Sequence, residues 1–232
     1  MRIAVFNQKG GVGKTTTTLN LAAAAHHQQT PALCIDFDPQ AHLTLAHGNV
    51  RGGPSRSLYA FFEQKATLNS LAINWPGIGK LLPAHPIMVK VESIFGNEPK
   101  IIRRLADGLQ DPAFSDVDVI MDCCPFLGVL SLNAMVAADL VLVPVASDML
   151  SLHGAEQIGY TLNALEKTLK RPIKRRYVLT RFDRRRKTSA EVQQQAAKRY
   201  GKQLCETVIS ESSALIESLG RHLDIYQHAP KN

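Results

Sequence analysis

The sequence predicts an α/β protein with an open, mostly parallel twisted sheet that carries helices on both faces. Short apolar runs alternate with longer segments of helical spacing along the chain. Strands of a parallel sheet take the form of such runs because helices cover both faces of the sheet. The 232 residues contain no internal repeat, low-complexity tract or convincing linker, so we expect a single domain spanning residues 1–232.

Five apolar runs are predicted to form buried strands, and segments of helical spacing are predicted to form the helices. The strands are expected at Arg2–Phe6, Ala32–Ile35, Val117–Met121, Leu140–Val145 and Tyr177–Thr180. The helices are expected at Thr15–His27, Leu150–Leu169 and Thr188–Tyr200, with a short one at Leu58–Lys65. Gly48–Ser57 has the composition of a surface loop, whereas the turn-rich segment Asn74–Pro86 is ambiguous.

A glycine-rich loop follows the first predicted strand and opens the first predicted helix. Gly10-Gly-Val-Gly-Lys14-Thr15-Thr16 has P-loop spacing in the strand–loop–helix context that a P-loop requires. Backbone N–H groups and the helix N-terminus would surround the phosphates. Lys14 would reach the β- and γ-phosphates, and the Thr15 hydroxyl would bind Mg²⁺. The predicted ATP-binding residues are Lys9, Gly10, Gly11, Val12, Gly13, Lys14, Thr15 and Thr16.

Three aspartates, Asp36, Asp38 and Asp122, each follow an apolar strand run. In an open parallel sheet, ligands bind beyond the carboxyl ends of the strands. We therefore expect all three carboxylates to converge on the nucleotide. Asp122 is placed like a Walker B acid, which holds Mg²⁺ through water.

Charge and composition narrow the class of protein. The formal net charge is +7, and the segment Lys170–Lys187 holds ten basic residues against one acid, Asp183. This concentration of positive charge makes a polyanionic partner plausible. No apolar run approaches the ~20 residues of a membrane helix, the N-terminus lacks a signal-peptide layout, and the four cysteines form no CxxC pair. We therefore expect a cytoplasmic protein with reduced cysteines.

A second lysine, Lys9, precedes the first glycine and gives the loop the deviant Walker A pattern. With this pattern the chain resembles the ParA/MinD family of deviant Walker A ATPases, and within it the ParA (Soj-like) partition ATPases. The resemblance extends over nearly the whole chain. Its most specific parts are the loop and Asp36-Phe-Asp38-Pro39-Gln40, and the supporting segments are Val119–Asp122 with Pro125, Val143–Val145, Thr180–Arg184 and Asp224–Pro230.

The resemblance implies that two identical subunits face each other with ATP at their interface, so dimerisation should require ATP. Lys9 would cross to the phosphates of the other subunit and stabilise negative charge there. Gly10 would stay small so that the two backbones can approach.

The resemblance also implies which residues bind Mg²⁺ and which take part in ATP hydrolysis. Asp36 would lie in the Mg²⁺ shell, and Asp38 would orient the attacking water. The expected catalytic residues of a slow ATPase are Lys9, Lys14 and Asp38, and the expected metal site consists of Thr15, Asp36 and Asp122.

ParA-like proteins bind DNA non-specifically as ATP dimers, and a ParB-like adaptor releases them by stimulating hydrolysis. The resemblance therefore implies a nucleoid-associated protein that partitions a plasmid or chromosome or positions another cargo. Lys and Arg side chains that neutralise phosphates give such binding its sensitivity to salt. The candidate DNA contacts are Arg181, Arg184, Arg185, Arg186 and Arg221.

Two alternatives belong to the same fold. A MinD-like membrane regulator would need a C-terminal amphipathic basic helix, whereas the end of this chain contains Pro230 and no such helix, so no membrane partner is expected. A metabolic enzyme would use ATP on a small substrate with fast turnover. The chain also departs from the ParA pattern: Cys123 and Cys124 stand where two prolines are common, and Glu217–His222 replaces a loop that often contains Pro and Gly.

Overall fold

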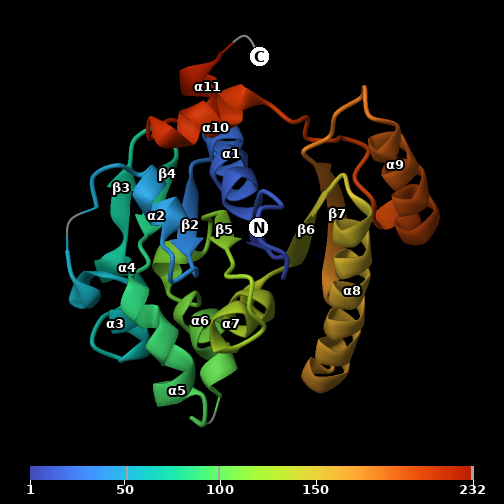
Figure 1. Ribbon diagram of the computed structural model, residues 1–232. Coiled ribbons are helices and arrows are strands. Elements are labelled where there is room, and N and C mark those ends of the chain that lie inside the picture. Colours follow the sequence, from blue (N-terminus) through green and yellow to red (C-terminus); the bar gives the residue numbers. More distant parts are fainter. Residues whose placement is uncertain (51, 99, 231–232) are drawn as a thin grey trace.

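A seven-stranded sheet forms the centre of the molecule (Figure 1). The computed structural model describes residues 1–50, 52–98 and 100–230. The strand order is β3-β4-β2-β5-β1-β6-β7, and all neighbouring strands are parallel except β3 and β4. The strands are β1 (Arg2–Val5), β2 (Ala32–Asp36), β3 (Ile73–Trp75), β4 (Gly79–Leu82), β5 (Val119–Asp122), β6 (Leu140–Ala146) and β7 (Lys174–Thr180). The predicted open, mostly parallel sheet is confirmed.

Successive residues of the central strands enter two separate apolar cores, one on each face of the sheet. In β2, Leu33 and Ile35 contribute to one core, whereas Ala32 and Cys34 contribute to the other. Side chains alternate along a strand, so a strand covered on both faces must be apolar at nearly every position. This explains why the sequence shows continuous apolar runs instead of alternating ones.

Helices from different parts of the chain cover the two faces (Figure 1). One face carries α1 (Lys14–His27) and α2 (His42–Ala46), and α10 (Ser213–Gly220) and α11 (Ile225–His228) lie beside α1. The other core receives side chains from α3 (Leu58–Phe62), α4 (Leu68–Leu71), α5 (Val91–Phe95), α6 (Arg104–Gly108), α7 (Val129–Ala137) and α8 (Met149–Leu169). The helix α9 (Lys187–Tyr200) packs against α8 near the edge strand β7. Short 3₁₀ turns lie at Pro54–Arg56, Pro86–Lys90, Ile101–Arg103, Pro112–Phe114 and Gly201–Gln203.

The five predicted strands and four predicted helices are all present, with shifted ends. The helix expected at Leu58–Lys65 ends at Phe62, and β7 begins at Lys174 instead of Tyr177. Charged residues are tolerated in the first half of β7 because it is an edge strand. The ambiguous segment Asn74–Pro86 contains β4 and the end of β3. The expected loop Gly48–Ser57 includes a 3₁₀ turn, and its residue 51 lies outside the described residues.

The parallel strands place their carboxyl ends along one edge of the sheet. Val5 pairs in register with Asp122, which in turn pairs with Asp36. The loops that follow β1, β2, β5, β6 and β7 therefore meet at this edge, where open α/β sheets bind their ligands. Among the residues that the structure describes, no helix has the length and apolar character needed to cross a membrane.

Candidate nucleotide site

The glycine loop takes a backbone conformation that leads from β1 directly into α1. Gly11 and Gly13 have φ angles of +73° and +87°, in the left-handed region that glycine adopts without steric cost. The N–H of Thr17 donates to the carbonyl of Gly13 at 2.8 Å and begins the hydrogen bonding of α1. The remaining N–H groups of the loop and first turn have no helical acceptor, which is the arrangement that binds phosphate.

Two side chains anchor this loop to neighbouring strands. Asn7 donates to the carbonyl of Pro144 in β6 at 2.7 Å, and its side-chain oxygen accepts from the N–H of Lys9 at 2.9 Å. The Thr180 hydroxyl at the end of β7 donates to the carbonyl of Val12 at 2.8 Å. Sequence reasoning assigned no role to either anchor, although both belong to segments that carry the family resemblance. Their hydrogen bonds hold the loop in shape before any ligand binds.

Lys14 and Thr15, for which phosphate and Mg²⁺ contacts are predicted, lie where the glycine loop enters α1. The Lys14 ammonium donates to the carbonyl of Lys9 at 3.1 Å and so lies across the loop. Burial lowers the pKa of Lys14, and the nearby carboxylates of Asp122 and Asp38 partly offset this effect. The Thr15 hydroxyl donates to Oδ2 of Asp122 at 2.6 Å. These contacts bring Lys14, Thr15 and Asp122 into one site.

Asp122 has a buried carboxylate oxygen with the chemistry of a cation ligand. Its Oδ1 is buried and has no hydrogen-bond partner among the described residues. Burial raises the pKa of Asp122 well above its usual value, and the negative charge of Asp36 raises it further. Mg²⁺ commonly binds one or two carboxylates together with substrate phosphates and waters. Thr15 and Asp122 therefore fit the expected Mg²⁺ site.

Asp36 and Asp38 lie beside Asp122, as predicted, but Asp36 is already heavily hydrogen-bonded. Its Oδ2 accepts from the N–H and hydroxyl of Thr44 at 2.8 and 2.6 Å, and its Oδ1 accepts from the N–H of Asp38 at 3.0 Å. Burial raises the pKa of Asp36 to about 7 despite the hydrogen bonds from Thr44. Asp38 itself accepts from the N–H of Gln40 at 2.9 Å. The structure therefore brings the three carboxylates together, with Asp36 also holding the start of α2.

Lys9 makes contacts within its own chain. Its ammonium donates to both carboxylate oxygens of Asp148, at 3.0 and 3.2 Å, and to the Ser151 hydroxyl at 2.8 Å. Asp148 is also the N-cap of α8, because it accepts from the N–H of Ser151 at 2.8 Å. Burial alone would raise the pKa of Asp148, but hydrogen bonds from Ser151 and Lys9 outweigh it and lower that pKa. The predicted crossing of Lys9 to a second subunit remains a prediction.

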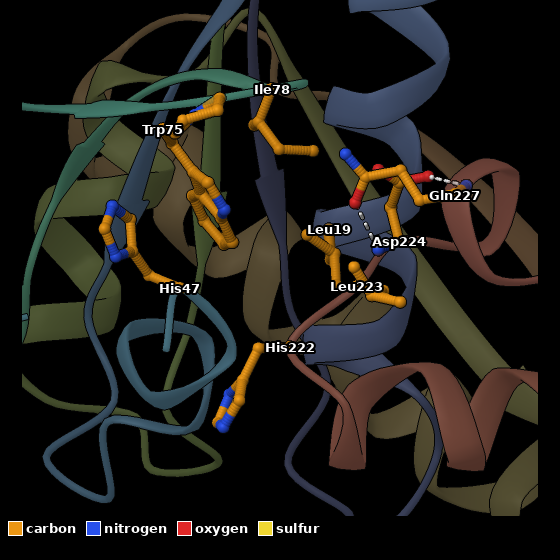
Figure 2. Close-up of a pocket in the computed structure, with 9 residues that line it drawn as sticks. Leu19, His47, Trp75, Ile78, His222, Leu223, Asp224 and Gln227 are labelled. Atoms are coloured by element: carbon orange, nitrogen blue, oxygen red, sulfur yellow. Dashed lines mark hydrogen bonds between the residues drawn. The ribbon is translucent and has the colours of Figure 1, made fainter. Parts of the chain in front are cut away.

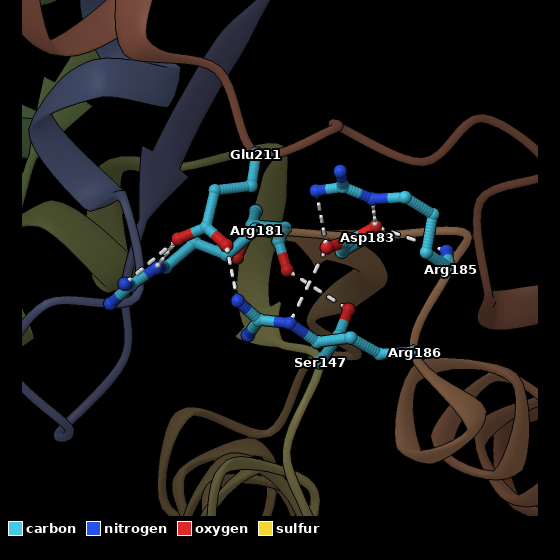
Figure 3. A network of polar contacts seen from close by, with 7 residues as sticks. Ser147, Arg181, Asp183, Arg185, Arg186 and Glu211 are labelled. Atoms are coloured by element: carbon cyan, nitrogen blue, oxygen red, sulfur yellow. Dashed lines mark hydrogen bonds and ion pairs between the residues drawn. The ribbon is translucent and has the colours of Figure 1, made fainter.

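The predicted DNA contacts do not form one uniform surface (Figure 3). Arg181 donates to Oε1 of Glu211 at 3.0 and 3.2 Å, whereas Arg185 donates to Asp183 at 3.0 Å. Arg186 reaches both acids, Asp183 at 3.4 Å and Glu211 at 3.5 Å. Hydrogen bonds from Arg185 lower the pKa of Asp183 to about 2.

The remaining two candidates are placed differently from that network. Arg184 forms no ion pair with any described residue. Arg221 follows α10, where its backbone N–H donates to the carbonyls of Glu217 and Ser218. Four of the five candidates thus share the loop between β7 and α9, and Arg221 lies at the end of another helix.

A separate cavity of about 230 Å³ lies between β3, β4 and the C-terminal helices (Figure 2). His47 and Trp75 form one wall, with ring centroids 5.4 Å apart, and Leu19 of α1 lies opposite them. Asp224 also lines the cavity and caps α11 by accepting from the N–H of Tyr226 and Gln227. The lining contains no residue of the glycine loop, so this cavity is not the phosphate site.

The strand–loop–helix unit and the acids beside it define a P-loop nucleotide-binding protein. A family model described as an AAA domain matches residues 1–175. The chromosome partitioning protein ParA of Myxococcus xanthus is 31% identical over 231 residues, which cover 97% of this chain and 81% of the relative. The chromosome-partitioning ATPase Soj of Thermus thermophilus is 34% identical over 230 residues, covering 99% and 88%. The chain belongs to the ParA/MinD family of P-loop ATPases, which confirms the resemblance of its motifs.

A solved structure supports the fold and the type of ligand. Cobyrinic acid a,c-diamide synthase from Mycobacterium smegmatis has a TM-score of 0.84 and 28% identity, covering 96% of this chain and 93% of that chain. That enzyme was solved with ADP and magnesium, and also with an ATP analogue and magnesium. The expected cofactors, ATP and Mg²⁺, agree with these ligands.

Proposed function

We propose that this chain is a ParA-like ATPase that binds ATP–Mg²⁺, dimerises with ATP at the interface and binds DNA non-specifically. Hydrolysis stimulated by a ParB-like adaptor then releases it from the nucleoid, so that a plasmid, chromosome or other cargo is partitioned. The observation that carries this proposal is the pre-formed deviant P-loop with a lysine on each side of its glycines. Sequence relatives named as partition proteins support the same role.

The nucleotide chemistry follows from the arrangement of the site. Lys14 and the backbone N–H groups of the loop bind the phosphates and neutralise their charge. When bound, Mg²⁺ neutralises charge that develops on the phosphate oxygens. Thr15 and Asp122 hold the Mg²⁺ site, with Asp36 beside them. Asp38 orients the water that attacks the γ-phosphate, and the basal rate is slow.

In the proposed dimer, each nucleotide gains a lysine from the facing subunit at its phosphates. Lys9 is half-exposed and held by Asp148, from which it can be transferred to the phosphates of a facing subunit. Exposed apolar side chains follow Asp122 and Asp148 closely in the sequence. The side chain of Phe126, shortly after Asp122, is 73% exposed, and that of Leu150, shortly after Asp148, is 77% exposed. A second subunit that covers these side chains would gain from their burial.

Positive charge in the loop between β7 and α9 supports the proposed DNA binding. The loop follows the carboxyl end of β7, and Thr180 at that end is bonded to Val12 of the glycine loop. Nucleotide and DNA sites on one edge of the sheet can be coupled through the same segments. Asp183 and Glu211 partly neutralise Arg181, Arg185 and Arg186. DNA binding therefore depends on the release of these arginines or on Arg184, which forms no ion pair with any residue that the structure describes.

The proposal is tested by measuring binding to non-specific duplex DNA without nucleotide, with ADP and with ATP–Mg²⁺ across a salt series. Strong binding only with ATP, weakening steeply with salt, is expected. Arg184→Glu combined with Arg185→Glu should weaken it, whereas Lys65→Glu combined with Lys90→Glu, at two exposed cations elsewhere on the surface, serves as the matched charge control. Absence of DNA binding in every nucleotide state would contradict the proposal. Fast ATP turnover without DNA would favour a metabolic enzyme. ATP-dependent pelleting with liposomes would favour a MinD-like membrane regulator.

A further inference from the structure

The helix α2 is too short to be stable by itself. It has five residues, His42–Ala46, whereas isolated helices need roughly 12–15 residues to form in water. Its N-cap is Ala41, whose methyl group cannot accept a hydrogen bond from the first turn. Contacts with the rest of the protein must therefore hold both ends of α2.

The beginning of α2 is held by the acidic edge of the nucleotide site. The N–H and the hydroxyl of Thr44 donate to Oδ2 of Asp36 at 2.8 and 2.6 Å, and the hydroxyl oxygen accepts from the N–H of Ala84 at 2.9 Å. Asp36 in turn accepts from the N–H of Asp38 at 3.0 Å. A shift of α2 would therefore move Thr44 and change the hydrogen bonds of Asp36.

A residue from the C-terminal part of the chain holds the other end of α2. His222 lies on the segment that follows α10 (Figure 2), and its Nδ1 is 2.9 Å from the carbonyl oxygen of Leu45. Because a carbonyl oxygen can only accept, Nδ1 carries the hydrogen and donates it. A Cβ atom at Gly48 would lie 2.9 Å from Cγ of His222, so glycine at this position leaves room for the imidazole.

The backbone of His222 adopts a conformation that usually belongs to glycine. The helix α10 ends in a Schellman motif, in which Leu223 donates to the carbonyl of Ser218 at 2.9 Å and His222 donates to that of Leu219 at 3.2 Å. His222 has a φ angle of +59°, where its Cβ is crowded. Glycine would avoid this steric cost but could not make the contact with α2. The strained residue at this position points to a role for the imidazole.

We propose that His222 is a positioning residue for the Mg²⁺ edge of the nucleotide site. It joins the end of α10 to the end of α2, and α2 holds Thr44 against Asp36. This role rests on the proposed binding of ATP–Mg²⁺, in which Asp36 lies beside the metal site. It also gives a function to Glu217–His222, the segment in which the chain departs from the ParA pattern.

Two variants of His222 separate the imidazole contact from the backbone conformation. His222→Gly relieves the strain and removes the donor. His222→Asn tolerates the left-handed conformation and keeps an N–H donor close to the position of Nδ1. Gln64→Gly is the matched control, because Gln64 is exposed, has the same φ angle of +59° and lies in the turn after α3. Only His222→Gly should differ from wild type.

Hydrogen exchange measured by mass spectrometry on the full chain without nucleotide provides the first readout. The amides of α2 should exchange about threefold faster in His222→Gly, which is the effect of losing one exposed hydrogen bond. Exchange in β1 should stay as in wild type. Unchanged exchange in α2, or equal acceleration throughout the chain, would overturn the proposal.

The affinity for a fluorescent ATP analogue, with Mg²⁺ and with EDTA, provides the second readout. His222→Gly should bind about threefold more weakly than wild type with Mg²⁺ and equally well in EDTA, and His222→Asn should restore the affinity. An equal loss in both conditions, no loss in either, or failure of His222→Asn to restore binding would overturn the proposal. A wild-type chain that does not bind the analogue would instead contradict the proposed function itself, and hydrogen exchange would still decide whether His222 holds α2.

Discussion

Removing the Asp148 carboxylate should lower the free energy of unfolding through two separate contacts, the N-cap of α8 and the ion pair with Lys9. Asp148 caps α8 by accepting from the N–H of Ser151, and it separately pairs with the ammonium of Lys9. Asp148→Ala removes both interactions. Asp148→Asn keeps an oxygen for the cap and removes the charge, so the two variants report on different contacts.

The expected magnitudes follow from the geometry. Replacing an N-cap aspartate by alanine costs about 1 kcal/mol. An ion pair whose side chains are 38% and 48% exposed contributes no more than about 0.5 kcal/mol. We therefore expect Asp148→Ala to lower the free energy of unfolding by about 1.5 kcal/mol and Asp148→Asn by about 0.5 kcal/mol. Because the pKa of Asp148 is lowered in the folded protein, this stabilisation is complete above the unfolded-state pKa and is lost as the pH falls through the folded-state value.

Urea unfolding without nucleotide measures these values, and a double-mutant cycle with Lys9→Ala isolates the ion pair. The coupling energy should be about 0.5 kcal/mol at low salt and should shrink as salt is added. Equal losses in Asp148→Asn and Asp148→Ala would refute the division into cap and ion pair. In the proposed dimer Lys9 leaves Asp148 to reach the second subunit, so Asp148→Asn should also dimerise with ATP at lower protein concentration than wild type. If Asp148→Asn needed a higher protein concentration than wild type to dimerise, this expectation would be contradicted.

Three further substitutions test the nucleotide site. Lys14→Ala should abolish ATP binding measured by calorimetry, because the lysine that lies across the loop is removed; retained affinity would exclude its phosphate role. Asp38→Ala should keep ATP binding but slow phosphate release at least tenfold, and unchanged hydrolysis would remove Asp38 from catalysis. Gly13→Ala places a side chain at φ +87° and should cost about 1 kcal/mol or more of stability while weakening ATP binding; a variant equal to wild type in both would show that this backbone conformation is dispensable.

The fold could be predicted well where local sequence determines it. The central strands are apolar on both faces, and the glycine loop marks the junction of β1 and α1. The short strands β3 and β4 carry the exposed residues Asn74 and Lys80, and turn residues separate the two strands. The apolar residues therefore form no periodic pattern long enough to identify either strand. The charged start of β7 gave no strand pattern, because an edge strand does not need to be apolar there.

The site was predictable to the same extent and for the same reason. Residues of the glycine loop and the strand-end aspartates lie in contiguous motifs. Asp148 lies 139 positions from Lys9 and Glu211 lies 30 positions from Arg181, so their pairings depend on the folded chain. Counting charges along the sequence likewise grouped Arg181 with Arg184 and Arg185, and it could not show that Arg181 lines a cavity together with Gly11 and Gly13.

In the proposed function, ATP at the P-loop controls dimerisation through Lys9. This control is tested most directly by measuring molar mass, by light scattering after size-exclusion chromatography, without nucleotide, with ADP–Mg²⁺ and with ATP–Mg²⁺. Asp38→Ala is used because it is expected to slow turnover during the run, and the same variant with Lys9→Ala is the comparison. We predict a dimer of Asp38→Ala only with ATP and a monomer in every state when Lys9 is also replaced. A dimer without nucleotide, or one that persists with ATP after the loss of Lys9, would contradict the proposed role of Lys9.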